Sequence, residues 1–254
     1  ENNMKPNNSK NSTKIDNPTL LYCALDNKDP ETVENLAIKL SGSVDGFKLG
    51  LEYFCHNGPA GINRIKNIGL PLFLDLKLHD IPNTVAEAVR SVAPLSPKYL
   101  TVHASGGTEM IKAAISATHE EADRLGTPRI RLLAVTILTS LSPLDLISMG
   151  IGSTTKDAVA KLTTLAAEVG IDGLVCSPEE ISIVRKEVGI HKEIFVPGIR
   201  PEGSMKNDQK RSATPRQAAN DGATALVVGR PITGAVNPSQ SAKKIKDEIG
   251  FKSF

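Results

Sequence analysis

The segment Leu72-Phe73-Leu74-Asp75-Leu76-Lys77-Leu78 alternates leucine with other side chains. Because side chains alternate across a β-strand, the four leucines share one face of such a strand, and Asp75 and Lys77 share the other. A carboxylate and an ammonium group on an inner face are costly to bury unless they pair. The segment therefore predicts a strand that packs its leucines against helices and holds an ion pair on its inner side.

Short apolar segments of this kind recur along the chain and alternate with helical patterns. The expected strands are 20–25, 46–49, 72–76, 99–103, 132–137, 173–176, 194–196 and 225–228. The expected helices are 60–68, 85–92, 108–125, 155–169, 178–188, 215–221, 239–249 and 30–40. Strands and helices in alternation predict parallel strands joined by crossover helices.

This alternation fits both a closed barrel and an open doubly wound sheet. Two observations favour the barrel: the eight strand–helix units and the polar residues at the strand ends, where barrel active sites form. These polar residues are Asp26, Lys48, Lys77, His103, Thr139 and Arg230. The chain has 254 residues, and roughly 250 is usual for one barrel. We predict the α/β class, with a single (β/α)8 TIM barrel as the catalytic domain over residues 19–254.

The composition narrows the possible partners and the compartment. Residues 1–18, rich in Asn, Lys and Ser, predict a disordered N-terminal tail. The 30 basic and 28 acidic residues give no reason to expect nucleic acid, and no apolar run is long enough to predict a membrane span. Three widely spaced cysteines fit free thiols in a reducing compartment, so we expect the cytoplasm, with Cys23 and Cys176 buried.

Lys77 lies between two carboxylates in the sequence, Asp75 and Asp80. Negative charge on both sides favours the ammonium form, which suits a proton donor better than a base or an amine nucleophile. A structural ion pair at the barrel rim is the alternative. The position at a strand end favours catalysis.

A second group of residues predicts a phosphate site. The loop over 198–215 is long enough to be a lid or a binding loop, and Gly229 and Arg230 follow the eighth expected strand. This loop contributes Arg200, Gln209, Lys210 and Arg211. The loops after strands seven and eight are the usual phosphate site of barrels, and the guanidinium group suits phosphate. A phosphorylated substrate follows from this placement.

Residues 73–84, FLDLKLHDIPNT, resemble the defining motif of the orotidine 5′-phosphate decarboxylase family. Shorter matches lie in order along the chain at 25–26, 47–48, 102–107, 138–140, 196–201, 208–211 and 228–231. The likeness covers about residues 19 to 248 and is greatest to the bacterial branch. It implies decarboxylation of orotidine 5′-monophosphate to uridine 5′-monophosphate in de novo pyrimidine biosynthesis, without a cofactor or a metal.

The resemblance also implies a role for individual residues. Lys48, Asp75, Lys77 and Asp80 match a charged tetrad in which Lys77 protonates C6 of the pyrimidine. Asp80 would reach into the neighbouring subunit's site, which implies a homodimer. The matching substrate contacts are Asp26 and Lys48 at the ribose, Thr84 near the partner's ribose, Thr139 at the pyrimidine amide, and Arg200, Gln209, Gly229 and Arg230 at the phosphate.

Three alternatives remain. A metal-using phosphosugar decarboxylase or epimerase shares the D-x-K-x-x-D pattern, but it lacks the continuation 79–84 and needs added acidic ligands. A Schiff-base aldolase needs an amine that deprotonates readily, which the flanking carboxylates oppose. A non-catalytic barrel would not need the charged residues together with Gln209 and Arg230. His79 and His103 lack metal-ligand spacing, so we expect them to orient neighbours and to pack at the rim, respectively.

Overall fold

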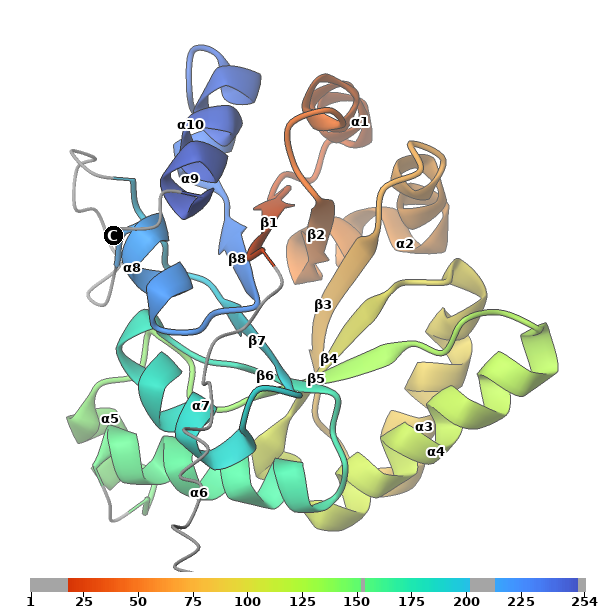
Figure 1. Cartoon of the computed structure of the whole chain (residues 1–254). Coiled ribbons are helices and arrows are strands. Elements are labelled where there is room, and N and C mark those ends of the chain that lie inside the picture. The colour runs from red at the N-terminus through yellow and green to blue at the C-terminus, as the bar shows by residue number, and fades with distance from the viewer. Residues whose placement is uncertain (1–17, 152–153, 202–212, 251–254) are drawn as a thin grey trace, which may run out of the picture.

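The computed structural model describes residues 18–151, 154–201 and 213–250, in which parallel strands close into a barrel (Figure 1). The strands are β1 (Leu20–Ala24), β2 (Gly46–Gly50), β3 (Leu72–Leu78), β4 (Tyr99–His103), β5 (Arg131–Val135), β6 (Gly173–Val175), β7 (Glu193–Val196) and β8 (Ala225–Val228). Each strand pairs with the next, and β8 pairs with β1. The predicted barrel is confirmed and the open sheet is not formed. Apart from Pro18, the expected tail lies outside the described residues.

Helices surround the barrel, as Figure 1 shows. The α-helices are α1 (Pro30–Leu40), α2 (Leu51–Lys66), α3 (Pro82–Val92), α4 (Thr108–Leu125), α5 (Pro143–Ser148), α6 (Thr155–Glu168), α7 (Ile181–Val188), α8 (Pro215–Asn220), α9 (Arg230–Thr233) and α10 (Pro238–Gly250). The 3-10 helices are η1 (Ala93–Leu95), η2 (Ala104–Gly106) and η3 (Pro178–Glu180). Over the described ranges, no helix combines the length and apolarity needed to cross a membrane.

Helix α2 begins at Leu51, so the expected start at residue 60 is wrong. Gly58 has non-helical backbone angles, with φ at 58°, and Pro59 follows it. Glycine and proline interrupt a helical pattern, and here they kink the helix instead of starting it. The turns before Gly58 therefore belong to a helix that the sequence pattern hides.

Two further helices differ from the expectation. Helix α5 lies in a segment with no expected helix, and Ser142 and Asp145 form a capping box at its start. The helix expected over 178–188 begins as the 3-10 helix η3 before α7. A short helix such as α5 buries little surface, so a capping box is the main sequence signal for it.

Two apolar layers pack on the two sides of the barrel wall. Leu72, Leu74 and Leu76 belong to the layer between strands and helices, as their alternation predicts. The barrel interior holds the rings of Tyr22, Phe73, Tyr99 and Phe195, whose centroids lie 4.7–6.4 Å apart. Close aromatic contacts of this kind fill the barrel. Within the barrel interior, a ligand site can therefore form only above this aromatic layer, at the mouth.

The cysteines follow the prediction. Cys23 and Cys176 are buried free thiols, and Cys55 is exposed. A buried thiol in an apolar strand behaves as a small hydrophobic side chain.

The amino ends of the strands hold a half-buried carboxylate. Glu193 accepts a hydrogen bond from the Tyr99 hydroxyl at 2.9 Å and pairs with Arg131 at 3.1 Å. Burial raises the pKa of Glu193 above its usual range, and the hydrogen bond from Tyr99 and the charge of Arg131 offset this only in part. The ionised form of Glu193 is therefore less favourable in the folded chain than in the unfolded chain.

Replacing Glu193 by Gln should change how stability depends on pH. A raised carboxyl pKa favours the folded state below the unfolded pKa, and this contribution is lost as pH rises through the folded pKa. The free energy of unfolding of the wild type, minus that of Glu193→Gln, should therefore fall as pH rises above about 4, the unfolded pKa of a glutamate. Urea unfolding of the two proteins at a series of pH values measures this difference. The exposed Glu52→Gln is the control, and a difference for Glu193→Gln that does not change with pH would contradict the burial argument.

Candidate active site

A cavity of about 370 Å³ opens at the carboxyl ends of the strands. Eight of the residues predicted from the sequence line this cavity: Asp26, Lys48, Asp75, Lys77, Thr139, Arg200, Gly229 and Arg230. Barrel enzymes place their active sites at this face. The structure thus brings most of the predicted site together in one cavity.

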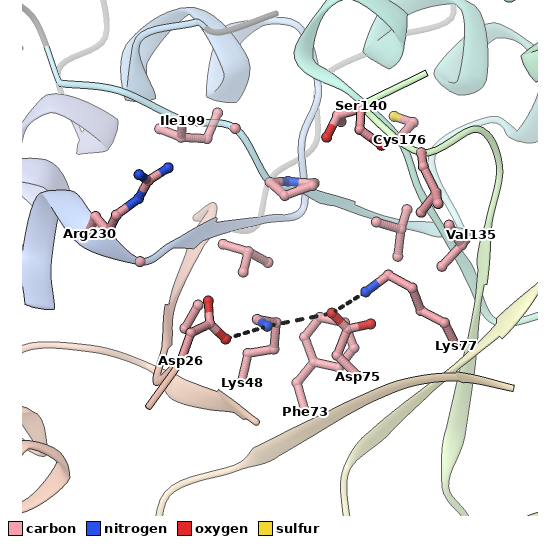
Figure 2. A pocket seen from close by; sticks show the side chains of 18 of the residues that line it. Asp26, Lys48, Phe73, Asp75, Lys77, Val135, Ser140, Cys176, Ile199 and Arg230 are labelled. Atoms are coloured by element: carbon pink, nitrogen blue, oxygen red, sulfur yellow. Dashed lines mark hydrogen bonds and ion pairs between the residues drawn. The ribbon is translucent and has the colours of Figure 1, made fainter. Parts of the chain in front are cut away.

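Four charged side chains form a continuous row along one wall of the cavity (Figure 2). The Lys48 ammonium lies 3.1 Å from Asp26 Oδ1 and 3.5 Å from Asp75 Oδ2. The Lys77 ammonium lies 2.8 Å from the same Asp75 oxygen. Two positive charges therefore share one carboxylate oxygen of Asp75.

Strand pairing places these residues side by side. Ala24 pairs with Lys48 between β1 and β2, and Gly50 pairs with Asp75 between β2 and β3. An added Cβ at Gly50 would lie 3.1 Å from the Lys48 ammonium. A contact this short would force the Lys48 side chain to move. Glycine at position 50 has no Cβ, and it therefore leaves space for the Lys48 ammonium group. Gly50 is not among the site residues predicted from the sequence.

Asp75 is only 8% exposed, yet its pKa lies below the ordinary range. Burial alone would raise the pKa. The charges of Lys48 and Lys77, together with hydrogen bonds from Lys77 and Thr101, more than offset this effect. Asp75 is therefore an ionised carboxylate at neutral pH, held beside two ammonium groups.

Strand β3 is irregular at its carboxyl end. Leu74 pairs with Leu100 and Leu78 with Val102, so four steps along β3 match two steps along β4. Lys77 within this interval has φ at 50°, in the left-handed region. The assumption of a regular strand up to residue 78 is therefore wrong, although Asp75 and Lys77 still meet as predicted.

Thr101 contacts both of these residues, although it is not among the site residues predicted from the sequence. Its hydroxyl donates to Asp75 Oδ1 at 2.9 Å and accepts the Lys77 backbone N–H at 2.9 Å. The signal was available, because alternation in β4 places Tyr99, Thr101 and His103 on one face.

Arg230 lies across the cavity from Lys77, next to Gly229 (Figure 2). An added Cβ at Gly229 would meet nothing closer than Ala24 Cβ at 3.5 Å, an ordinary contact. Protein neighbours therefore do not require glycine there. Its absent side chain leaves the backbone beside Arg230 accessible to a ligand, as an anion site needs.

The remaining phosphate-side candidates lie on the loop after β7. The Arg200 backbone N–H donates to the Ala213 carbonyl at 3.0 Å, which ties the two described ends of this loop together. Gln209, Lys210 and Arg211 lie outside the described residues.

Asp80 and Thr84 do not line the cavity. Both residues are exposed, and the Asp80 carboxylate accepts the Ile81 backbone N–H at 2.7 Å. The chain alone therefore does not bring these two predicted residues to its own site.

His79 and His103 lie beside each other, with ring centroids 5.4 Å apart. Both line a second, mostly apolar cavity of about 630 Å³. Burial lowers the pKa of His103, and the charges of His79 and Lys77 lower it further. The contact between the His79 and His103 rings fits the packing role expected for His103. Within the described ranges, no three or more His, Cys, Asp or Glu side chains are placed to hold a metal ion.

The fold and the cavity define a TIM-barrel enzyme with an ion-paired lysine at the barrel mouth and an arginine across from it. Residues 19–245 match the sequence profile described as the Orotidine 5'-phosphate decarboxylase / HUMPS family. The chain belongs to this family, which confirms the resemblance carried by residues 73–84.

Individual relatives agree with this assignment. Orotidine 5'-phosphate decarboxylase of Paramagnetospirillum magneticum is 47% identical over 231 residues, covering 91% of this chain and 98% of that protein. The enzyme of the same name from Rhodospirillum rubrum is 46% identical over 230 residues, covering 90% and 93%. The crystal structure of orotidine 5'-phosphate decarboxylase from Lactobacillus acidophilus superposes with a TM-score of 0.79 at 35% identity, covering 92% and 100%.

Replacing Lys48 by Met should destabilise the fold, because Asp75 would keep only one of its two neighbouring positive charges. We expect a loss of about 2 kcal/mol in the free energy of unfolding at neutral pH. A carboxyl pKa held low by its partners contributes stability that is lost as pH falls, so the loss should shrink in acid. Urea unfolding at neutral and acidic pH measures the loss and its decrease in acid. The exposed Lys39→Met on α1 is the control, and equal stabilities of the two variants would contradict the prediction.

Proposed function

We propose that the chain decarboxylates orotidine 5′-monophosphate to uridine 5′-monophosphate and CO2 in pyrimidine biosynthesis, with Lys77 as the proton donor. The observation that carries the proposal is the Lys77 ammonium, which lies 2.8 Å from the buried Asp75 in the cavity that Arg230 also lines. Membership of the family and the names of the relatives support the same reaction.

The reaction needs a stabilised negative charge and then a proton. Loss of CO2 breaks the bond between C6 and the carboxylate carbon and leaves the electron pair on C6, which has no obvious electron sink. A positive charge beside C6 stabilises this state. Lys77 then transfers a proton to C6, which leaves a neutral amine that regains its proton from water.

Asp75 has two roles in this proposal. Its carboxylate holds the Lys77 ammonium by an ion pair. It also lies where the substrate carboxylate would depart, so like-charge repulsion would raise the free energy of the bound substrate and be relieved by loss of CO2.

The other cavity residues bind the nucleotide away from C6. Asp26 and Lys48 contact the ribose in this proposal, and Thr139 contacts the pyrimidine amide. The phosphate contacts are Arg200, Gln209, Gly229 and Arg230. Binding energy from a phosphate group remote from the reacting carbon can serve to orient the substrate and close the site.

Asp80 and Thr84 would act in the site of a second copy of the chain. Both are exposed and absent from their own cavity, and the neighbouring Ile81 is 66% exposed. Leu138 and Met149 are also exposed, and they line the second cavity together with His79. Exposed apolar side chains near one another are typical of a protein interface. We infer a homodimer in which Asp80 of each chain completes the other chain's site.

The same proposal treats residues 19–254 as one catalytic domain. Direct pairing of β8 with β1 supports it, because the barrel closes on itself. The enzyme would work in the cytoplasm, without a metal or an organic cofactor.

A spectrophotometric assay tests the reaction. The purified chain should consume orotidine 5′-monophosphate in the presence of EDTA, while Lys77→Ala should fold and bind uridine 5′-monophosphate but lose activity by at least about 100-fold. An inactive wild type would refute the proposed function. Activity that EDTA abolishes would instead favour a metal-using barrel enzyme, and an active Lys77→Ala would refute the role of Lys77.

Hybrid dimers test the shared site. Lys77→Ala and Asp80→Ala chains carrying different tags should each be nearly inactive. Their co-purified hybrid has one intact site of two, so it should recover about half of the wild-type turnover. A hybrid of Lys77→Ala with the double variant Lys77→Ala/Asp80→Ala is the control, because it has no intact site. An inactive first hybrid would mean that Asp80 acts within its own chain.

A further inference from the structure

We propose that Thr101 is a positioning residue for decarboxylation, because its hydroxyl fixes the backbone of Lys77 and the carboxylate of Asp75 at the same time. This inference rests on the proposed function, in which Lys77 donates the proton. Thr101 lies in β4, is 0% exposed, and does not line the cavity, so it acts through its two neighbours.

The two hydrogen bonds are compatible with one hydroxyl. A threonine hydroxyl has one proton to donate and lone pairs to accept. The Lys77 backbone N–H can only donate, so Thr101 Oγ1 accepts there at 2.9 Å. The hydroxyl proton is then available for Asp75 Oδ1, also at 2.9 Å. The ionised state of Asp75 makes this second bond charge-assisted.

The backbone of Lys77 needs such a contact. A residue with a side chain is uncommon in the left-handed region, and Lys77 has φ at 50°. This conformation persists only where the surroundings hold it. The register of β3 against β4 shifts between Leu74 and Leu78, so the regular ladder is interrupted there. The Thr101 hydroxyl therefore offers the Lys77 N–H a hydrogen-bond partner within the interruption.

The same hydroxyl fixes the orientation of Asp75. Thr101 engages Oδ1, and the ammonium groups of Lys77 and Lys48 lie 2.8 Å and 3.5 Å from Oδ2. With both oxygens assigned, the carboxylate cannot rotate without losing contacts. Lys77 is thus held at its backbone by Thr101 and at its ammonium group by Asp75, and Thr101 also orients Asp75. A proton donor must be placed within a fraction of an ångström of its target, so this double contact would act on turnover.

Valine has nearly the volume of threonine but lacks the hydroxyl, so Thr101→Val tests the role of the hydrogen bonds. We expect kcat for orotidine 5′-monophosphate to fall about 10-fold to 100-fold. The KM and the Kd for uridine 5′-monophosphate should stay within about threefold, since the phosphate contacts are untouched. Thr101→Ser should keep most of the turnover. Thr163→Val is the matched control, because Thr163 is buried on α6 and its hydroxyl has no hydrogen-bond partner within the described residues.

The pH profile separates positioning from packing. The Thr101 hydroxyl is one of the groups that lower the pKa of Asp75, so its loss should move the acidic limb of kcat to higher pH. The other charged groups that act on Asp75 are Lys48 on β2 and Lys77 on β3, and the half-buried His103 lies on β4. All three are the same in the threonine, serine and valine chains, so a shift seen with valine and absent with serine reports the hydroxyl.

Several outcomes would overturn the inference. If Thr101→Val keeps wild-type kcat and pH profile, the hydroxyl does not position Lys77. If Thr101→Val and Thr101→Ser lose activity equally, in proportion to lost stability in urea, the role is structural only. If Thr101→Val does not fold, Thr101→Ala gives the same two readouts. An inactive wild type would refute the proposed function itself, whereas an active wild type with an unaffected Thr101→Val would refute only the role of Thr101.

Discussion

The charge on Asp75 is the constraint on which the mouth of this barrel depends. A buried carboxylate is unfavourable unless it is paired and hydrogen-bonded, and three neighbouring strands supply the groups that do this. Lys48 on β2 and Lys77 on β3 bring positive charge to one oxygen, and Thr101 on β4 donates to the other. Because each of these strands contributes one group, the positions of the three partners of Asp75 are set by the pairing of β2, β3 and β4 rather than by a loop.

The aromatic layer inside the barrel gives this row a firm base. Phe73 precedes Asp75 by two residues on β3, so alternation points both side chains inward, one above the other. Phe73 packs edge-on against Tyr22 and Phe195 and fills the barrel below the cavity that it also lines. The closed side of the cavity excludes water from the direction of the core. Charges in such a site interact more strongly than in water, which is what the proposed stabilisation of negative charge on C6 requires.

The sequence predicted the barrel and eight of the residues that line the cavity, largely because strand positions follow from simple periodicity. Apolar alternation located the strands, and the ends of parallel strands meet at one face. The left-handed backbone of Lys77 was not predictable in this way, since it depends on how β3 pairs with β4. Thr101 was within reach of the same alternation argument that selected Asp75. The first half of α2 was hidden because the kink at Gly58 resembles a helix start.

The strained position of Lys77 suggests why an ion pair and a hydrogen bond act on one residue. An ammonium group on a flexible side chain samples many positions, and fixing it only through Asp75 would leave its backbone free to adopt the regular strand. The interrupted ladder turns the backbone at Lys77, and the Thr101 hydroxyl holds that turn. The fold therefore stabilises the left-handed backbone of Lys77 before substrate binds, so the site needs less reorganisation during the reaction. In the proposed mechanism, a proton donor held in this way from a strand is better preorganised than one carried on a loop.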